Sequence, residues 1–127
     1  MKTLNAICII DDDPITVFGM RKILQSVVEC NSLFTFANGK LAIDEMKNRV
    51  ANKLSIPEVI FLDINMPIMD GWQFLEEFID LPLHQKVRIN MVTSSIDPLD
   101  RQNYERYKNK SEHPLTYNNK PIRKSQI

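Results

Sequence analysis

Acidic, hydroxyl and basic residues stand where the apolar stretches of this chain end. The stretch "AICII" is followed by Asp11 and Asp12, and "IPEVIFLD" ends in Asp63. The stretch "VRINMVTSS" reaches Thr93 near its end, and Lys120 follows "PLTYNN". In a parallel sheet the carboxyl ends of the strands share one edge, and ligands bind beyond that edge. If these stretches are strands of one sheet, we expect three carboxylates, a hydroxyl and an ammonium group to converge there.

Carboxylates held this close repel one another and raise each other's pKa, unless a cation lies between them. Mg²⁺ suits that place because it prefers oxygen ligands and often completes its shell with phosphate oxygens. Asp11 and Asp12 are adjacent and suit the metal, whereas Asp63 stands alone and suits a nucleophile that forms an acyl phosphate. Lys120 would neutralise an incoming phosphoryl group, and Thr93 would donate a hydrogen bond to it. These residues therefore predict an aspartyl phosphoacceptor that works with Mg²⁺.

The elements that must position these residues alternate between strands and helices. Apolar, β-branched stretches predict strands at 6–10, 32–36, 56–63, 87–95 and 114–119. Helical spacing of apolar residues and Asp-Pro helix starts predict helices at 14–28, 40–50, 72–79 and 97–110. This order predicts an α/β fold with a parallel five-stranded sheet and helices on both of its faces. Too few residues follow the last strand for a full closing helix, so we expect a short final element.

Composition limits the class of protein. The 127 residues fit one domain with one core, and 16 Lys and Arg balance 16 Asp and Glu. Zero net charge gives no support to the binding of nucleic acid or of an anionic membrane. No apolar run approaches a membrane span of roughly 20 residues, and the N-terminus lacks the pattern of a signal peptide. Two cysteines without metal-type spacing predict neither a zinc site nor a disulfide scaffold, so we expect a reducing cytoplasm.

Several other side chains are predicted to be structural. Cys8 lies inside an apolar stretch and is expected to be a small core residue. Trp72 is expected to anchor the third helix at the edge of the core. His84 and His113 fall in loop-like stretches, and we expect both at the surface, without a catalytic partner.

Each site residue also has an ordinary structural explanation. Asp11 and Asp12 could be acids at a helix N-terminus, where the helix dipole favours negative charge. Asp63 alone could be a loop acid, Thr93 could cap a strand end, and Lys120 could be surface charge. The chemical interpretation is favoured because all five fall on one predicted edge of the sheet.

Four pieces of the sequence together resemble the receiver domain of two-component response regulators. They are "IIDDDP" at the first strand end, "FLDINMPIMDG" at the third, "VTSS" at the fourth and "NNKP" at the fifth. They occur in the family's order and at about its spacing, and the match covers essentially the whole chain, residues 1–127. The resemblance implies a flavodoxin-like fold of five βα units with strand order 2-1-3-4-5. It also implies one receiver domain without an output domain, either stand-alone or excised.

The resemblance implies a role for each polar residue at the predicted edge. Asp63 matches the aspartate that is phosphorylated. Asp11 and Asp12 match the acidic pair that holds Mg²⁺, with Asp12 the direct ligand. Thr93 matches the switch hydroxyl that moves toward the phosphoryl group, and Lys120 matches the lysine that contacts the phosphate.

Two further positions and a partner follow from the same resemblance. Asn65 matches the residue whose backbone carbonyl completes the metal site. Tyr117 matches the aromatic residue that swings inward as Thr93 moves, although a strand tyrosine often serves only for packing. The implied phosphoryl donor is a phosphohistidine on a sensor histidine kinase or a histidine phosphotransfer protein, and the implied output is a switched protein-binding surface. The stretch "SEHPL" departs from the family's small residues before the fifth strand.

Two other functions would use similar residues. An aspartyl phosphatase or phosphotransferase needs a second acid near the nucleophile and a lid. Here Asn65 stands two residues after Asp63, and 127 residues leave no room for a cap domain. A degenerate receiver would bind a partner without phosphorylation, and the intact set of acids, hydroxyl and lysine argues against it. Steady turnover of a small phosphoester would favour the enzyme, and Mg²⁺-independent partner binding would favour the binding module.

Overall fold

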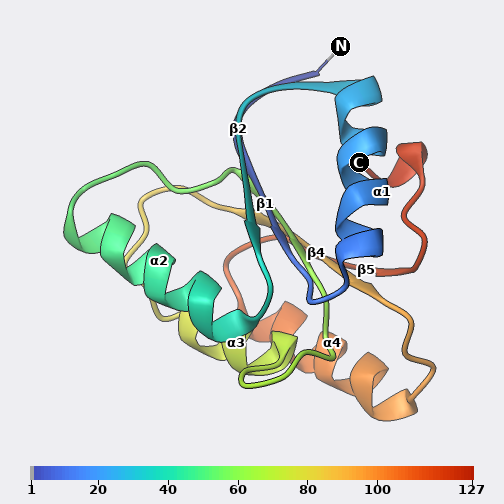
Figure 1. Ribbon diagram of the computed structural model, residues 1–127. Helices are drawn as coiled ribbons and strands as arrows, with labels where there is room; N and C mark the ends of the chain where they lie inside the picture. Colours follow the sequence, from blue (N-terminus) through green and yellow to red (C-terminus); the bar gives the residue numbers. More distant parts are fainter. Residues whose placement is uncertain (1) are drawn as a thin grey trace.

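The computed structural model describes residues 2–127, in which strands and helices alternate along the chain (Figure 1). The elements are β1 (Lys2–Ile10), α1 (Pro14–Val27), β2 (Val28–Phe36), α2 (Gly39–Ala51), β3 (Val59–Leu62), α3 (Gly71–Phe78), β4 (Arg88–Thr93), α4 (Pro98–Lys110), β5 (Leu115–Asn119) and the 3-10 helix η1 (Lys124–Gln126). The predicted order of elements is confirmed, including a final element much shorter than a full helix.

The five strands form one parallel sheet in the order β2-β1-β3-β4-β5. This confirms the predicted flavodoxin-like α/β fold. β1 pairs with β2 along its length, but with β3 only at Ile7–Ile10, where Ile10 lies opposite Leu62. Because β1 and β3 end in register, the residues that follow the two strands come side by side.

Helices cover both faces of the sheet (Figure 1). On one face, α2, α3 and α4 contribute buried side chains such as Ile43, Phe74 and Tyr104 to the larger part of the core. On the other face, Met20 of α1 and Ile122 of the C-terminal segment belong to the smaller part. η1 lies beside α1 on that second face. The prediction of two covered faces is confirmed.

Capping residues in the sequence set where the helices begin. Asp13 caps α1 by accepting a hydrogen bond from the N–H of Ile15, with Pro14 as the first helical residue. Asp97 caps α4 in the same way ahead of a proline. At α3, the Asp70 side chain accepts from the Gln73 N–H, and the Gln73 side chain accepts from the Asp70 N–H.

The boundary between α1 and β2 was predicted wrongly. Val28 was expected to continue the helix, but its backbone is extended, it begins β2 and its side chain is buried. A β-branched residue fits this extended, buried position well. β1 and β2 are also longer than the predicted strands at 6–10 and 32–36. The pairing of the two strands holds polar residues such as Glu29, opposite Thr3, in the sheet, although the local sequence carries no apolar strand signal there.

The prediction that His113 lies at the surface was wrong, whereas His84 is exposed as expected. His113 is only 8% exposed, and its Nδ1 accepts a hydrogen bond from the Val87 N–H at 2.9 Å. Its ring lies 5.2 Å from the Phe78 ring. Burial holds the pKa of His113 below its ordinary value, so the neutral ring is favoured.

The predictions for two other structural residues are confirmed. Cys8 is fully buried in β1, and Cys8 and Cys30 are free thiols. Trp72 is buried at the start of α3 and belongs to the larger part of the core. None of the helices at residues 2–127 combines the length and hydrophobicity that crossing a bilayer requires.

Candidate functional site

Main-chain hydrogen bonds fix the positions of two of the acids. Asp11 directly follows β1, and its N–H donates to the Phe36 carbonyl at 3.0 Å. Asp63 directly follows β3, and its N–H donates to the Ile10 carbonyl at 2.9 Å. Both hydrogen bonds extend the strand ladders by one residue, so the backbones of the two acids are held by the sheet.

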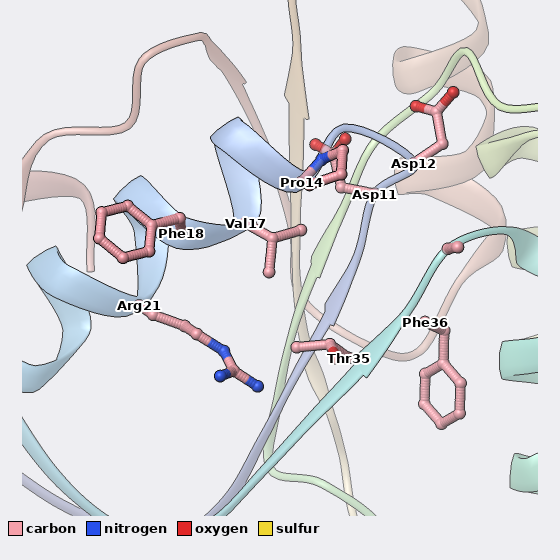
Figure 2. A pocket seen from close by; sticks show the side chains of 9 residues that line it. Asp11, Asp12, Pro14, Val17, Phe18, Arg21, Thr35 and Phe36 are labelled. Carbon is pink, nitrogen blue, oxygen red and sulfur yellow. The ribbon is translucent and has the colours of Figure 1, made fainter.

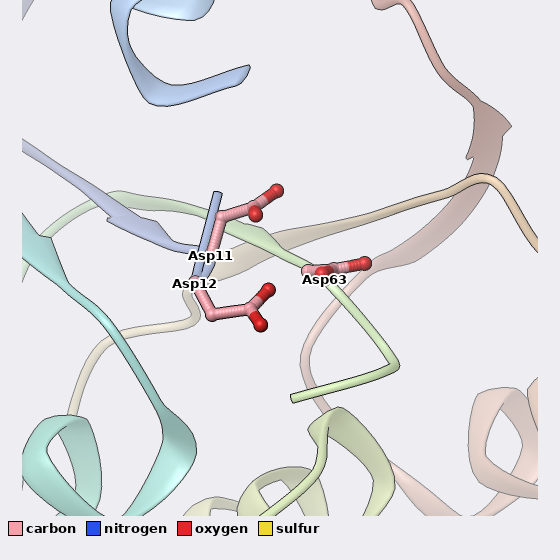
Figure 3. A group of neighbouring side chains, drawn as sticks. All are labelled: Asp11, Asp12 and Asp63. Carbon is pink, nitrogen blue, oxygen red and sulfur yellow. The ribbon is translucent and has the colours of Figure 1, made fainter. Parts of the chain in front are cut away.

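The structure brings Asp11, Asp12 and Asp63 together at the carboxyl end of the sheet. Each offers a carboxylate oxygen within 4.8 Å of the others, and the three side chains point to the same side (Figure 3). Asp11 and Asp63 are buried, at 4% and 5% exposure, whereas Asp12 is exposed. A cluster of oxygen donors that is open on one side matches the preference of Mg²⁺, which retains water molecules in its shell.

Lys120 supplies positive charge to this cluster. It follows β5, and its N–H donates to the Thr93 carbonyl at 2.9 Å. Its Nζ lies 2.9 Å from Asp11 Oδ2 and 3.5 Å from Asp63 Oδ1. Burial by itself would lower the pKa of Lys120, but the hydrogen bond to Asp11 and the charge of Asp63 outweigh it and raise the pKa. The ammonium group is therefore charged at neutral pH.

The carboxyl group of Asp63 is strongly perturbed. Burial raises its pKa to about 6, and the neighbouring Asp11 carboxylate adds to the rise. Lys120 and the Ile64 N–H, which donates to Asp63 Oδ1 at 2.9 Å, act in the opposite direction and are outweighed. Any positive group that enters the site therefore stabilises the ionised form of Asp63, because the charges already present do not offset its burial.

The two residues matched to a conformational switch lie on neighbouring strands. Thr93 ends β4 and is fully buried, and its Oγ1 accepts a hydrogen bond from the Ser95 N–H at 3.0 Å. Tyr117 lies in β5 and is half-buried. Its ring is 5.4 Å from that of Tyr104 and 5.3 Å from the Arg101 guanidinium, so it packs against α4.

The loop between β3 and α3 bends back over Asp63. Asn65 is exposed in this loop, and Ile68 has a φ of 70°, a strained conformation for a β-branched residue. The Gly71 N–H donates to the Ile64 carbonyl at 2.8 Å. A Cβ atom at Gly71 would lie 2.3 Å from the Asp63 carbonyl oxygen, so only glycine allows this approach.

A cleft of about 400 Å³ opens beside the acidic pair, between α1 and the end of β2 (Figure 2). Asp11 and Asp12 line one end of it, and Phe18 and Arg21 of α1 line its wall. Asp63 is not among the lining residues. The acidic pair is therefore reached from solvent on the side of Asp12.

Sequence reasoning missed one residue that contacts both the start of α3 and the loop after β4. Asp100 of α4 accepts hydrogen bonds from the Trp72 indole N–H and from the Ser95 hydroxyl. No local pattern indicates the contact with Trp72, which is 28 positions away in the sequence.

Comparison with protein families gives a match over most of the chain. The sequence model described as "Response regulator receiver domain" matches residues 7–110.

Curated relatives are longer proteins with the name protein-glutamate methylesterase/protein-glutamine glutaminase. The one from Methanococcoides burtonii is 40% identical over 63 residues, which are 50% of this chain and 16% of that protein. The one from Treponema pallidum is 39% identical over 93 residues, with 65% of this chain and 21% of that protein covered. The chain thus spans about a fifth or less of the length of these relatives.

Solved structures share the fold along nearly the whole chain. A two-component response regulator from Cytophaga hutchinsonii superposes with a TM-score of 0.81 at 25% identity, covering 98% of this chain and 92% of that one. The CheX-CheY-BeF3-Mg complex from Borrelia burgdorferi gives a TM-score of 0.71 at 23% identity, covering 96% of this chain and 82% of that one.

Proposed function

The chain belongs to the response regulator receiver domain family, and from that premise we propose that Asp63 is its phosphoacceptor. We propose that residues 1–127 form this one receiver domain. The observation that carries the proposal is the setting of Asp63. It is buried, its pKa is raised to about 6, and its Oδ1 lies 3.5 Å from the charged Lys120. At neutral pH the carboxylate is therefore ionised, rigidly held and beside a cation, as a nucleophile toward phosphorus needs to be.

The positions of Asp63, Lys120 and Thr93 support a direct transfer of the phosphoryl group to Asp63. A carboxylate oxygen of Asp63 forms a bond to phosphorus while the bond from phosphorus to the donor's nitrogen or oxygen breaks, and the leaving group takes that electron pair. Lys120 neutralises charge on the phosphoryl oxygens. The Thr93 hydroxyl then donates to a phosphoryl oxygen. The movement of Thr93, with that of Tyr117, shifts a protein-binding surface of the domain between two states.

We propose Mg²⁺ as the cofactor, held by Asp11, Asp12, Asp63 and the backbone carbonyl of Asn65, with Asp12 as a direct ligand. The donor set supports this, since three carboxylates offer oxygens within 4.8 Å of one another. The ion would supply positive charge to phosphoryl oxygens during transfer.

The proposed donor is a phosphohistidine on a sensor histidine kinase or a histidine phosphotransfer protein, and the proposed output is a protein partner. The complex from Borrelia burgdorferi named above contains a second protein bound to a receiver, which supports a partner of this kind. Free thiols at Cys8 and Cys30 suit a reducing compartment, and we propose the cytoplasm.

We propose that these 127 residues regulate rather than catalyse turnover. The methylesterase and glutaminase names of the curated relatives belong to proteins of which this chain spans about a fifth or less. Asn65 stands where an aspartyl phosphatase would need its general acid. Steady hydrolysis of p-nitrophenyl phosphate that requires Asp63 would contradict the proposal.

The test is the intact mass of the protein after incubation with acetyl phosphate, with and without Mg²⁺. We expect the gain of one phosphoryl group in the wild type with Mg²⁺, and no gain in Asp63→Asn. Asp80→Asn is the matched control, because Asp80 is an exposed aspartate beyond the end of α3. An Asp63→Asn variant that still gains the group at the same rate would place the phosphoacceptor elsewhere.

A further inference from the structure

One carboxylate joins the start of α3 to the loop between β4 and α4, near the proposed phosphoacceptor. Asp100 lies in the first turn of α4. Its Oδ1 accepts a hydrogen bond from the Trp72 Nε1–H at 2.9 Å, and its Oδ2 accepts one from the Ser95 hydroxyl. Asp100 therefore links the start of α3 to the loop between β4 and α4.

The Ser95 end of this link reaches Thr93. The Ser95 N–H donates to Thr93 Oγ1 at 3.0 Å, while the Asp97 N–H donates to Ser95 Oγ at 3.1 Å. Ser95 thus uses its backbone to hold Thr93 and its hydroxyl to hold Asp100. A rotation of Thr93 that turns Oγ1 toward Asp63 removes the acceptor from the Ser95 N–H.

The Trp72 end is also held on two sides. Trp72 follows Gly71, whose N–H is bonded to the loop after Asp63. The indole is 8% exposed and stacks on the Tyr107 ring of α4, with centroids 5.6 Å apart and planes 9° apart. The indole environment therefore depends on how α3 and α4 sit against each other.

We propose that Asp100 is a positioning residue that couples Thr93 to Trp72, so that a movement of Thr93 changes the contact between α3 and α4. The coupling runs through hydrogen bonds from Thr93 to Ser95, from Ser95 to Asp100 and from Asp100 to Trp72. It rests on the proposed function only for its trigger, a phosphoryl group on Asp63. The hydrogen bonds of the network are already present in the chain before phosphorylation.

The resting chain can be tested without phosphorylation. Trp72 is the only tryptophan, so its indole N–H gives a single NMR resonance. We expect Thr93→Val and Ser95→Ala to move this resonance and to speed its hydrogen exchange. Ser94→Ala, at an exposed neighbour, is the control and leaves the resonance in place.

Asp100→Ala tests the coupling itself. It removes both carboxylate oxygens, so that neither the indole N–H nor the Ser95 hydroxyl keeps this partner. In an Asp100→Ala background we expect Thr93→Val to leave the indole resonance where Asp100→Ala alone puts it. A Thr93→Val displacement of the same size in both backgrounds, or no displacement by Thr93→Val and Ser95→Ala in the wild type, would overturn the proposal.

The trigger is tested with acetyl phosphate and Mg²⁺, with the phosphoryl gain measured by intact mass. We expect the indole resonance to move on phosphorylation in the wild type. We expect Asp100→Ala to gain the same mass while its indole resonance stays where it was before phosphorylation. A phosphorylated wild type with the indole at its resting position would contradict the coupling. Absence of any mass gain would count against the proposed function alone, because the resting variants decide the Asp100 network independently.

Discussion

Asp63 and His113 are buried titratable side chains at opposite ends of the sheet, with similar exposure of 5% and 8%. At the carboxyl end, burial and the Asp11 charge raise the pKa of Asp63 to about 6. At the amino end, burial lowers the pKa of His113, and its ring nitrogen accepts a hydrogen bond from Val87. Burial favours the neutral form in both cases, but at neutral pH only Asp63 is charged.

The difference separates a structural site from the site for which we propose phosphoryl transfer. His113 is neutral, its Nδ1 accepts a hydrogen bond and its ring packs on Phe78, so the amino end of the sheet gains stability from it. Asp63 is ionised next to another carboxylate. The carboxyl end of the sheet therefore loses stability at neutral pH and gains affinity for a cation. Substitutions at each end sharpen or break this comparison.

The largest loss of stability is expected from Gly71→Ala at the carboxyl end. The new Cβ would lie 2.3 Å from the Asp63 carbonyl oxygen and 3.0 Å from the Ile64 Cα. The backbone has to shift, and we expect a loss of about 3 kcal/mol or more in the free energy of unfolding. Urea unfolding measures it, and a loss below about 1 kcal/mol would show that the loop after Asp63 is not tightly held.

At the amino end, His113→Ala is expected to lower the free energy of unfolding by about 2 to 3 kcal/mol. It leaves the buried Val87 N–H without its acceptor and removes the ring that packs on Phe78. The exposed His84→Ala is the control, with little change expected.

The pH dependence of the same protein tests the His113 assignment. The folded pKa of His113 is below its unfolded value, so its contribution to stability is present above about pH 6.5 and is lost as the pH falls below it. The free energy of unfolding of the wild type should therefore approach that of His113→Ala as the pH is lowered. A difference between the two that grows on acidification would mean that the imidazole is held in its charged form.

Asp63→Asn is expected to stabilise the protein at pH 8. The folded pKa of about 6 lies above the unfolded value, so ionisation of Asp63 costs stability as the pH rises through 6. The shift corresponds to about 3 kcal/mol at most, and solvent screening reduces the expected gain to about 1 to 2 kcal/mol. Urea unfolding without divalent cations should show the gain at pH 8 and none near pH 4. An equal gain at both pH values would assign the effect to packing instead of charge.

The smallest effect is expected away from both ends, in the middle of α1. Gly19 has open space where a Cβ would stand, so Gly19→Ala should stabilise the protein by about 0.5 to 1 kcal/mol through helix propensity. Thermal unfolding measures the gain. A loss would show that the surface of α1 at Gly19 is not free.

The sequence by itself determined the alternation of strands and helices, the helix starts at Asp13 and Asp97, and the polar residues that end each strand. These features are local, because periodicity, capping and proline geometry act over a few residues. The convergence of Asp11, Asp63 and Lys120 was also predictable, since strand ends of a parallel sheet share one edge.

Only the tertiary structure decided the burial of His113, the strand start at Val28 and the link through Asp100. Val87, the partner of His113, is 26 positions away, and Trp72, one of the two partners of Asp100, is 28 positions away. Val28 lies in β2 because β1 is there to pair with it. The raised pKa of Asp63 also belongs here, because it depends on burial and on the distance to charges that other strands supply.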